Sequence, residues 1–253
     1  MQLTRKVIVV EANEDVVLDY NYHYELMKDV YRSLEVANPQ LAHKTHDEGY
    51  KIENKIYKLF THHLYIEKAD YTSEGIKIKK GTKCKLTVSG VKEVIKNVVF
   101  GYIEKSSMDL FGTKYKVLEV QNDKKVKFNN ITLYKMRNPL VATRQDENKR
   151  IIYMNPFEED YYTVLANNLK RKYKLVYGKD YTGELYFDIE DTFSIKKRLI
   201  SNIKENGILI GYSDFELYLV ADKDMQKVAY YCGLGSNNSL GMGMGTFITS
   251  RRD

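Results

Sequence analysis

The sequence has little of what disulfide-stapled folds, membrane spans and zinc sites require. Its 253 residues include no tryptophan and only two cysteines. Cys84 and Cys232 have no CxxC spacing and too few companions for a disulfide framework or a zinc site, so we expect both to be small core residues. No apolar run approaches the roughly 20 residues that a membrane-spanning helix needs. The first residues turn polar too soon for a signal peptide, so we expect a cytoplasmic protein without a membrane partner.

The overall composition is that of a mildly basic globular protein. Hydrophobic residues make up 43% of the chain, charged residues make up 29%, and the formal net charge is +6. These proportions exclude disorder over most of the chain, and the length suits one large domain or two small ones. The charge is compatible with a nucleic-acid partner without requiring one. The 22 tyrosines could stack on unpaired bases, although a composition biased as in an AT-rich genome explains them more simply.

The first half of the chain alternates strand and helix patterns. Leu26, Val30 and Leu34 share one face of a predicted helix, which Asn38-Pro39 should end because proline disfavours the helical region for the residue before it. A turn is expected at Ser89-Gly90. In order, we predict a strand at 6–10, a helix at 21–37, strands at 55–61 and 75–88, a helix at 91–102 and a strand at 115–120.

After a polar linker at 121–125, the same order recurs with looser spacing. We predict strands at 127–143 and 151–153, a helix from Pro156 to Tyr173, strands around 185–187 and 217–220, a helix at 222–232 and a strand at 247–249. Two ferredoxin-like (RRM-like) βαββαβ domains in tandem, an α+β fold, are the simplest account. The expected domains are residues 1–122 and 126–253, although no residue-level repeat links them.

A glycine-rich loop precedes the last predicted strand. Residues 233–245 hold 5 of the chain's 15 glycines and no charged side chain. A dinucleotide fingerprint would need glycine at Asn238, and a P-loop would need Gly-Lys-Ser or Gly-Lys-Thr, so both are excluded. Two interpretations remain open: an amide-rich loop that lies along a phosphate backbone, or a turn that packs a helix onto a sheet.

Two stretches at opposite ends of the chain carry a family resemblance. The loop resembles the C-terminal glycine-rich motif of the CRISPR-associated repeat-processing endoribonucleases, the Cas family numbered six within the repeat-associated RNA-binding superfamily. A second stretch is similar to the family's N-terminal active-site region. It comprises Asn21–Leu26, Val30–Arg32, Asn38-Pro39, Leu41-Ala42, His46 and Lys58–Thr61.

The resemblance implies cleavage of precursor CRISPR RNA within its repeats, without a metal or other cofactor. The ribose 2′-hydroxyl attacks the adjacent phosphorus, which leaves a 2′,3′-cyclic phosphate and a 5′-hydroxyl. Tyr31, His46 and Lys58 match the family's catalytic positions. We favour His46 as the acid on the leaving oxygen because histidine titrates near neutral pH. Lys58 would stabilise charge on the phosphate, and Tyr31 could act as the base only if Lys58 lowered its pKa.

Alternatives to these roles follow from the surrounding residues. His43, three residues before His46, is a possible substitute for it, and no cysteine or third histidine lies nearby to complete a zinc site. By spacing alone, Tyr31 could be an aromatic at the edge of the core, His46 a solvated histidine in a polar connection, and Lys58 a lysine on the solvent face of a strand. We interpret His62-His63 as strand-edge residues and not as ligands.

The expected partner is CRISPR repeat RNA, as pre-crRNA and crRNA, bound through phosphates with salt-sensitive affinity. Other Cas proteins of an interference complex are further candidate partners, and the protein would be a monomer or a homodimer. The rival function is a non-cleaving crRNA-binding subunit of an effector complex. The predicted RNA-binding residues are Lys51, Lys55, Lys170, Arg171, Lys172, Gly233, Gly235, Asn237, Asn238, Ser239, Gly241 and Gly243.

Overall fold

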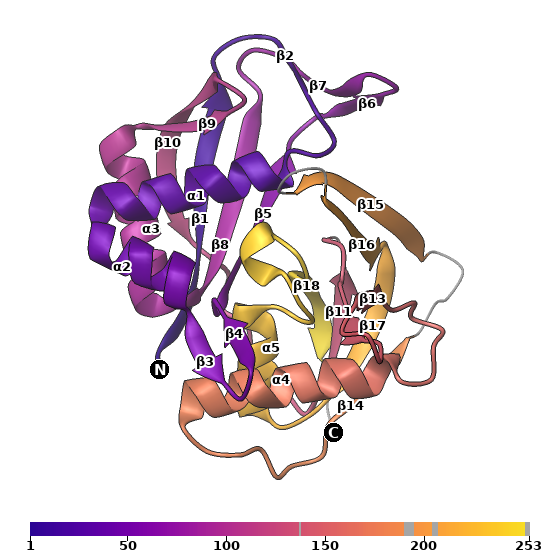
Figure 1. Ribbon diagram of the computed structural model, residues 1–253. Helices are drawn as coiled ribbons and strands as arrows, with labels where there is room; N and C mark the ends of the chain where they lie inside the picture. Colours follow the sequence, from indigo (N-terminus) through magenta and orange to yellow (C-terminus); the bar gives the residue numbers. More distant parts are fainter. Residues whose placement is uncertain (137, 190–194, 204–206, 251–253) are drawn as a thin grey trace.

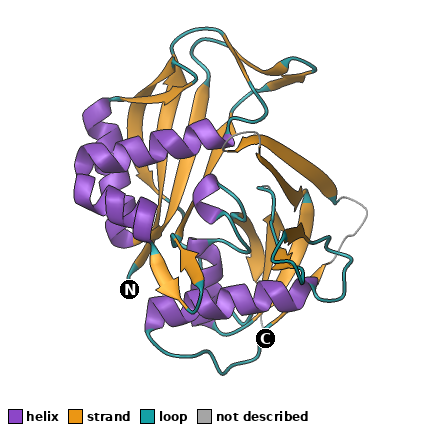
Figure 2. Ribbon diagram, viewed as in Figure 1, coloured by secondary structure: helices purple, strands orange, loops and turns teal. Residues whose placement is uncertain are grey.

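The chain forms two sheet-and-helix units that lie side by side (Figure 1). The computed structural model describes residues 1–136, 138–189, 195–203 and 207–250. Figure 2 shows helices gathered on one side of the N-terminal sheet, whereas a long helix lies along the lower edge of the C-terminal unit. Among the described residues, no helix is long and apolar enough to cross a membrane.

The N-terminal unit has the predicted β-α-β-β-α-β order. Its antiparallel sheet runs β5-β8-β1-β10-β9, so the first strand lies at the centre. The elements are β1 (Leu3–Ala12), α1 (His23–Ala37), β5 (Phe60–Ile66), β8 (Lys83–Val91), α3 (Lys92–Lys105), β9 (Ser107–Leu110) and β10 (Thr113–Asn122). Leu26, Val30 and Leu34 of α1 are buried, as their spacing predicts.

Short elements join these strands and correct four expectations. The polar connection after Pro39 is helical, and the expected strand at 55–61 is divided where Leu59 adopts φ of +51°. The expected strand at 75–88 forms two strands, at 75–78 and 83–91. Ser89-Gly90 lies inside β8 and is not a turn; a Cβ on Gly90 would lie 2.4 Å from the Leu59 carbonyl oxygen, so the neighbouring backbone leaves no room for a side chain. The short elements are α2 (Pro39–His43), a π-helical turn (Lys44–Glu48), β2 (Val16–Leu18), β3 (Tyr50–Ile52), β4 (Lys55–Tyr57), β6 (Asp70–Thr72) and β7 (Gly75–Ile78).

The C-terminal unit repeats the same strand arrangement. Its sheet runs β14-β17-β11-β18, which again places the first strand beside the third and fourth. The elements are β11 (Ile131–Met136), α4 (Tyr161–Tyr177), β14 (Tyr186–Ile189), β17 (Phe215–Val220), α5 (Lys223–Cys232) and β18 (Gly245–Ser250). Outside this sheet lie β12 (Thr143–Gln145), β13 (Ile151–Tyr153), β15 (Lys196–Ile203), β16 (Gly207–Ser213) and a 3₁₀ turn (Asn238–Leu240). The tandem ferredoxin-like fold is therefore confirmed.

The helix expected from Pro156 begins later, at Tyr161. The Glu158 carboxylate accepts a hydrogen bond from the Asn155 amide at 2.7 Å, and the Glu158 amide donates to the Asn155 carbonyl at 2.9 Å. These bonds close a turn, which leaves Phe157 64% exposed instead of on the buried helix face. Local hydrogen bonding by Asn155 competes here with helix formation.

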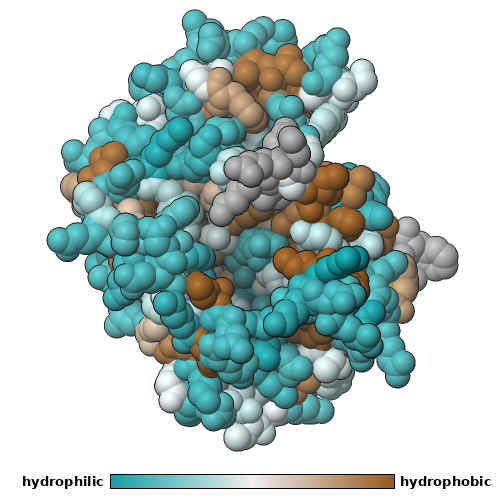
Figure 3. Space-filling view, viewed as in Figure 1, coloured by the Kyte–Doolittle hydropathy of each residue, from teal (hydrophilic) through white to brown (hydrophobic). Residues whose placement is uncertain are grey.

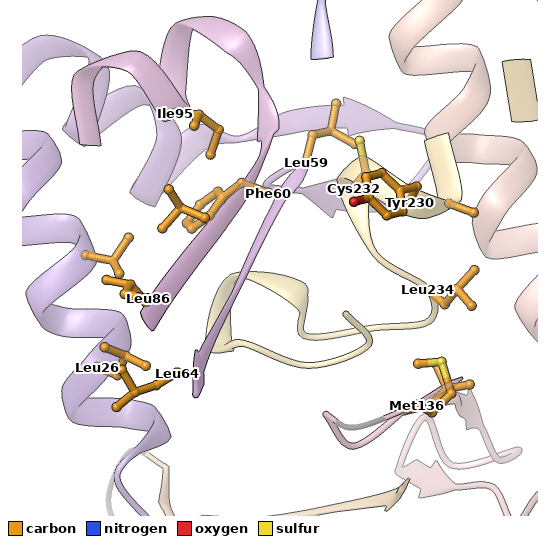
Figure 4. Close-up of a cluster of buried hydrophobic side chains, with 14 of the residues drawn as sticks. Leu26, Leu59, Phe60, Leu64, Leu86, Ile95, Met136, Tyr230, Cys232 and Leu234 are labelled. Atoms are coloured by element: carbon orange, nitrogen blue, oxygen red, sulfur yellow. The ribbon is translucent and has the colours of Figure 1, made fainter. Parts of the chain in front are cut away.

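The two units share one continuous hydrophobic core. Figure 4 shows Leu26, Phe60 and Leu86 of the N-terminal unit in the same cluster as Met136 and Cys232 of the C-terminal unit. Cys84 and Cys232 are buried and unpaired, as expected of core residues. Between the units, the Ser89 hydroxyl donates to the Tyr231 carbonyl at 2.9 Å, which fixes α5 against β8.

Candidate active site

His46 lies in the π-helical turn that follows α2. The side chain of Asn38 accepts a hydrogen bond from the Leu41 amide at 3.0 Å and caps α2, so the helix starts at Pro39 and carries the chain directly into this turn. His46 Nδ1 lies 2.7 Å from Asp47 Oδ1, and its side chain is 57% exposed. The carboxylate therefore orients the ring and leaves Nε2 as the nitrogen available to a ligand.

The same carboxylate also contacts the second histidine. His43 Nε2 lies 3.2 Å from Asp47 Oδ2. A hydrogen bond from His46 holds the pKa of the Asp47 carboxyl below its usual range. Asp47 was not predicted as a site residue, although its spacing of four from His43 on a helical turn is a signal that could have identified it.

Tyr31 of α1 stands between His46 and the N-terminal core. Its ring meets the edge of the His46 ring at a centroid distance of 4.9 Å and an angle of 84°, and it packs on Phe60 at 5.6 Å. Burial raises the pKa of Tyr31, which a hydrogen bond to the Ser239 side chain only partly opposes. A raised pKa favours the protonated phenol, which donates a hydrogen bond and does not take up a proton.

Lys58 follows β4 and reaches back to the histidine turn. Its Nζ donates a hydrogen bond to the His46 carbonyl oxygen. Partial burial lowers the pKa of Lys58, and the nearby Asp47 carboxylate opposes that shift. The structure thus brings together Tyr31, His46 and Lys58, which are separated by up to 27 positions in the sequence.

The glycine loop packs along β5, the edge strand of the N-terminal sheet. Thr61 donates from Oγ1 to the Met242 carbonyl at 3.1 Å, and His62 Nε2 lies 3.0 Å from the Ser239 carbonyl. Gly241 touches the His62 ring so closely that a Cβ would lie 2.9 Å from it. The loop covers this edge of the sheet, which would otherwise be exposed. His62, expected at a strand edge, is 1% exposed beneath the loop.

Lys172 of α4 holds this loop from inside. Its Nζ donates to the carbonyl oxygens of Gly233 at 2.7 Å and Gly235 at 2.8 Å, and to Asn238 Oδ1 at 2.7 Å. Burial lowers the pKa of Lys172 to about 7, whereas three acceptors favour the ammonium form, which has three protons to donate. Its position three residues after the buried Leu169 was the sequence signal of a core-facing lysine.

These contacts divide the predicted RNA-binding residues. Lys172 is 1% exposed, so the expectation that it contacts RNA phosphates is wrong. The loop amides that donate inside the protein include those of Gly233, Gly241 and Gly243. Asn237, Lys51, Lys55 and Lys170 are exposed, Asn238, Ser239 and Arg171 are partly exposed, and the remaining predicted loop residue, Gly235, is buried.

Two hollows lie beside the glycine loop and the strands that it contacts. The first, of about 290 Å³, adjoins Lys58 and Ser239. The second, of about 940 Å³, lies where residues of β5, β8 and β18 approach the segment between the units, and its lining includes Lys124, Lys125 and Lys127. Lys124 and Lys125 belong to the predicted linker, and Lys127 follows it. Among the residues that the structure describes, no cluster of three or more histidine, cysteine, aspartate or glutamate side chains could hold a metal ion.

Comparison with known proteins follows the two-unit division. A family model described as CRISPR-associated protein Cas6, N-terminal, matches residues 17–121, and one described as CRISPR associated protein Cas6, C-terminal, matches residues 121–246. The CRISPR-associated endoribonuclease Cas6 1 of Methanocaldococcus jannaschii is 28% identical over 244 residues, which cover 93% of this chain and 89% of the relative. The CRISPR-associated endoribonuclease Cas6 of Pyrococcus furiosus is 24% identical over 250 residues, with coverage of 96% and 89%.

Solved structures share the fold at lower identity. One described as CRISPR associated protein Cas6 has a TM-score of 0.80 at 24% identity and covers 98% of this chain and all of its own. Another, described as an RAMP protein binding different RNA substrates, has a TM-score of 0.81 at 16% identity, with coverage of 97% and 100%. Because consecutive Cas6 models match both units and the tandem fold agrees, this chain belongs to the Cas6 family of CRISPR-associated proteins.

Proposed function

We propose that the protein is a metal-independent endoribonuclease that cleaves precursor CRISPR RNA within its repeats. The observation that carries the proposal is the exposed His46 ring, held through Nδ1 by Asp47 and flanked by Lys58 and Tyr31. The names of the M. jannaschii and P. furiosus relatives, both CRISPR-associated endoribonucleases, support the same activity.

The reaction transfers a phosphorus bond from one oxygen to another. The 2′-oxygen bonds to phosphorus as its proton leaves, the bond from phosphorus to the 5′-oxygen breaks, and the 5′-oxygen takes up a proton. His46 Nε2 delivers that second proton, and the Lys58 ammonium stabilises the charge that gathers on the phosphate. The products are a 2′,3′-cyclic phosphate and a 5′-hydroxyl.

Tyr31 has a positioning role in this scheme. Because burial keeps its phenol protonated at neutral pH, the hydroxyl orients groups by hydrogen bonding, while the ring supports His46. The proton of the 2′-hydroxyl then goes to His43 or to solvent. Replacing His43 separates the two routes, because His43→Ala reduces cleavage only if His43 accepts that proton.

Repeat RNA would bind across both hollows. The exposed lysines at 124, 125 and 127 form a basic wall to the larger one, which suits a phosphate backbone and a salt-dependent affinity. Arg171, Lys55 and Lys58 supply positive charge at the smaller one.

The deciding experiment incubates the protein with the repeat RNA encoded beside its gene, in excess EDTA. We expect one cut within the repeat, a product that ends in a cyclic phosphate, and no cut when the attacking ribose is 2′-deoxy. A repeat that is bound but stays intact would contradict the proposal and favour a non-cleaving crRNA-binding subunit. Cleavage that stops in EDTA would contradict metal independence alone.

A further inference from the structure

The smaller hollow shares residues with the proposed catalytic group. Lys58 and Ser239 line it, and these are the residues that contact His46 and Tyr31. Figure 3 shows this face of the molecule hollowed between the two units. The walls come from segments that are distant in sequence: Lys55–Leu59, Thr143, three residues of α4 (Val164, Asn168 and Arg171) and Gly235–Ser239 of the glycine loop.

The walls combine apolar, polar and cationic side chains. Tyr57, Leu59 and Val164 contribute apolar groups, Asn168 contributes a carboxamide, and Lys58 and Arg171 contribute positive charge. Arg171 forms a 2.8 Å ion pair with Glu53, which orients its guanidinium. A nucleotide has the matching pattern, since its base has flat apolar faces and its phosphate is anionic.

One side chain that lines this hollow carries a buried polar atom without a partner among the described residues. The Oδ1 atom of Asn168 is fully buried and accepts no hydrogen bond. An unsatisfied buried acceptor is destabilising, and an apolar side chain at this place in α4 would avoid that cost. A ligand that donates a hydrogen bond to Oδ1 accounts for an asparagine here.

We propose that this hollow is a pocket for the base of one of the two nucleotides that flank the scissile phosphate, and that Asn168 reads its edge. The inference rests on the proposed function and deepens it. A carboxamide recognises an exocyclic amino group and the neighbouring ring nitrogen of a base. The occupant is therefore an amino-bearing base, and uracil is disfavoured. The volume of about 290 Å³ lies at the lower end of the range for ligand pockets, which suits one base.

The test measures single-turnover cleavage of the repeat RNA with each flanking nucleotide replaced in turn by the four bases and by an abasic residue. For the unmodified protein, we expect uracil or an abasic residue at one flank to slow cleavage roughly tenfold. In Asn168→Ala this penalty should disappear at that flank, while the repeat is still cut. Alanine favours helix, so α4 should remain intact.

The matched control is Asn167→Ala, the same change at the neighbouring, exposed position of α4. This variant should keep the base preference of the unmodified protein. If Asn168→Ala keeps it as well, or if the repeat is cut with no preference at either flank, the pocket assignment is overturned while the proposed function stands. A repeat that is not cut under any condition removes both proposals.

Discussion

The segment from His43 to Lys58 and the glycine loop from 233 to 245 both contribute residues to the smaller hollow, but they differ in exposure and in charge. The first is exposed and rich in titratable side chains, and its polar groups face solvent or one another. The second has no charged side chain, and most of its glycines are buried. Chemistry on a large ligand needs accessible groups, whereas the loop needs close packing. The comparison teaches that a glycine-rich motif can support a candidate active site by packing against neighbouring elements.

Lys58 and Lys172 differ in the same way. Lys58 is partly buried and its ammonium adjoins the exposed histidine turn. Lys172 is buried, and its ammonium group donates three hydrogen bonds to acceptors in the loop. Equal charge therefore has different consequences, because only Lys58 is placed where an RNA phosphate can approach.

The largest expected effect comes from the exposed region. His46→Ala should reduce the rate of repeat cleavage by roughly 10² to 10⁴, the range for loss of a general acid. Affinity for a 2′-deoxy repeat should stay within about twofold, and the free energy of unfolding should change by less than about 0.5 kcal/mol because the side chain is exposed. Single-turnover kinetics and urea titration measure these quantities. The assignment of His46 as the general acid is contradicted if His46→Ala still cleaves the repeat normally while His43→Ala does not.

A smaller effect is expected from the buried region. A Cβ at Gly243, where φ is +69°, would lie 1.9 Å from the Leu234 carbonyl oxygen. Gly243→Ala should therefore lower the free energy of unfolding by about 3 kcal/mol, through both backbone strain and collision. The matched control is Gly178→Ala, with φ of +73° and no atom within 4 Å, which should cost about 1 kcal/mol through strain alone. Equal losses in the two variants, measured by urea titration, would show that loop packing contributes nothing.

The smallest effect concerns pH and the contact between the loop and β5. Burial lowers the pKa of His62 from 6.5 to about 3. Between those values the unfolded chain binds a proton that the folded protein does not, so the free energy of unfolding falls as pH falls below 6.5. From pH 7.5 to 5.5 this loss is about 1.4 kcal/mol.

The variant His62→Gln isolates this effect, because glutamine does not titrate and can still donate to the Ser239 carbonyl. Lowering the pH from 7.5 to 5.5 should reduce the free energy of unfolding of the unmodified protein by that amount more than it reduces that of His62→Gln. The variant should therefore become more stable relative to the unmodified protein at the lower pH. A difference that is constant with pH would mean that His62 is not kept neutral under the loop.

Much of the fold follows from local pattern. The stripe of Leu26, Val30 and Leu34 predicts α1, and the order of strands and helices predicts both ferredoxin-like units. Element boundaries were less predictable, because they depend on single backbone conformations such as that of Leu59 and on local bonds such as those between Asn155 and Glu158.

The candidate site divides similarly. The family resemblance identified Tyr31, His46 and Lys58, and the structure brings them together. The resemblance did not identify Asp47, for which only the spacing from His43 gave a signal. It also did not identify Asn168 as a buried acceptor in the lining that includes Lys58, because that depends on side-chain placement. The sequence also did not show that the linker lysines border the larger hollow, since a run of charges does not reveal which surface it faces.

The sequence by itself determined the tandem element order, the family resemblance and the reactive residue types, because these depend on periodicity and on residue identity. Only the tertiary structure showed that the ammonium group of Lys172 donates hydrogen bonds to the uncharged glycine loop, and that most of the glycines in this loop are buried. The scarcity of cysteine in the sequence excluded a fold held by disulfides. Only the structure showed that both cysteines are buried and that the two units share one hydrophobic core. Burial is the physical reason, because whether a group is solvated, paired or enclosed depends on contacts between residues far apart in the chain.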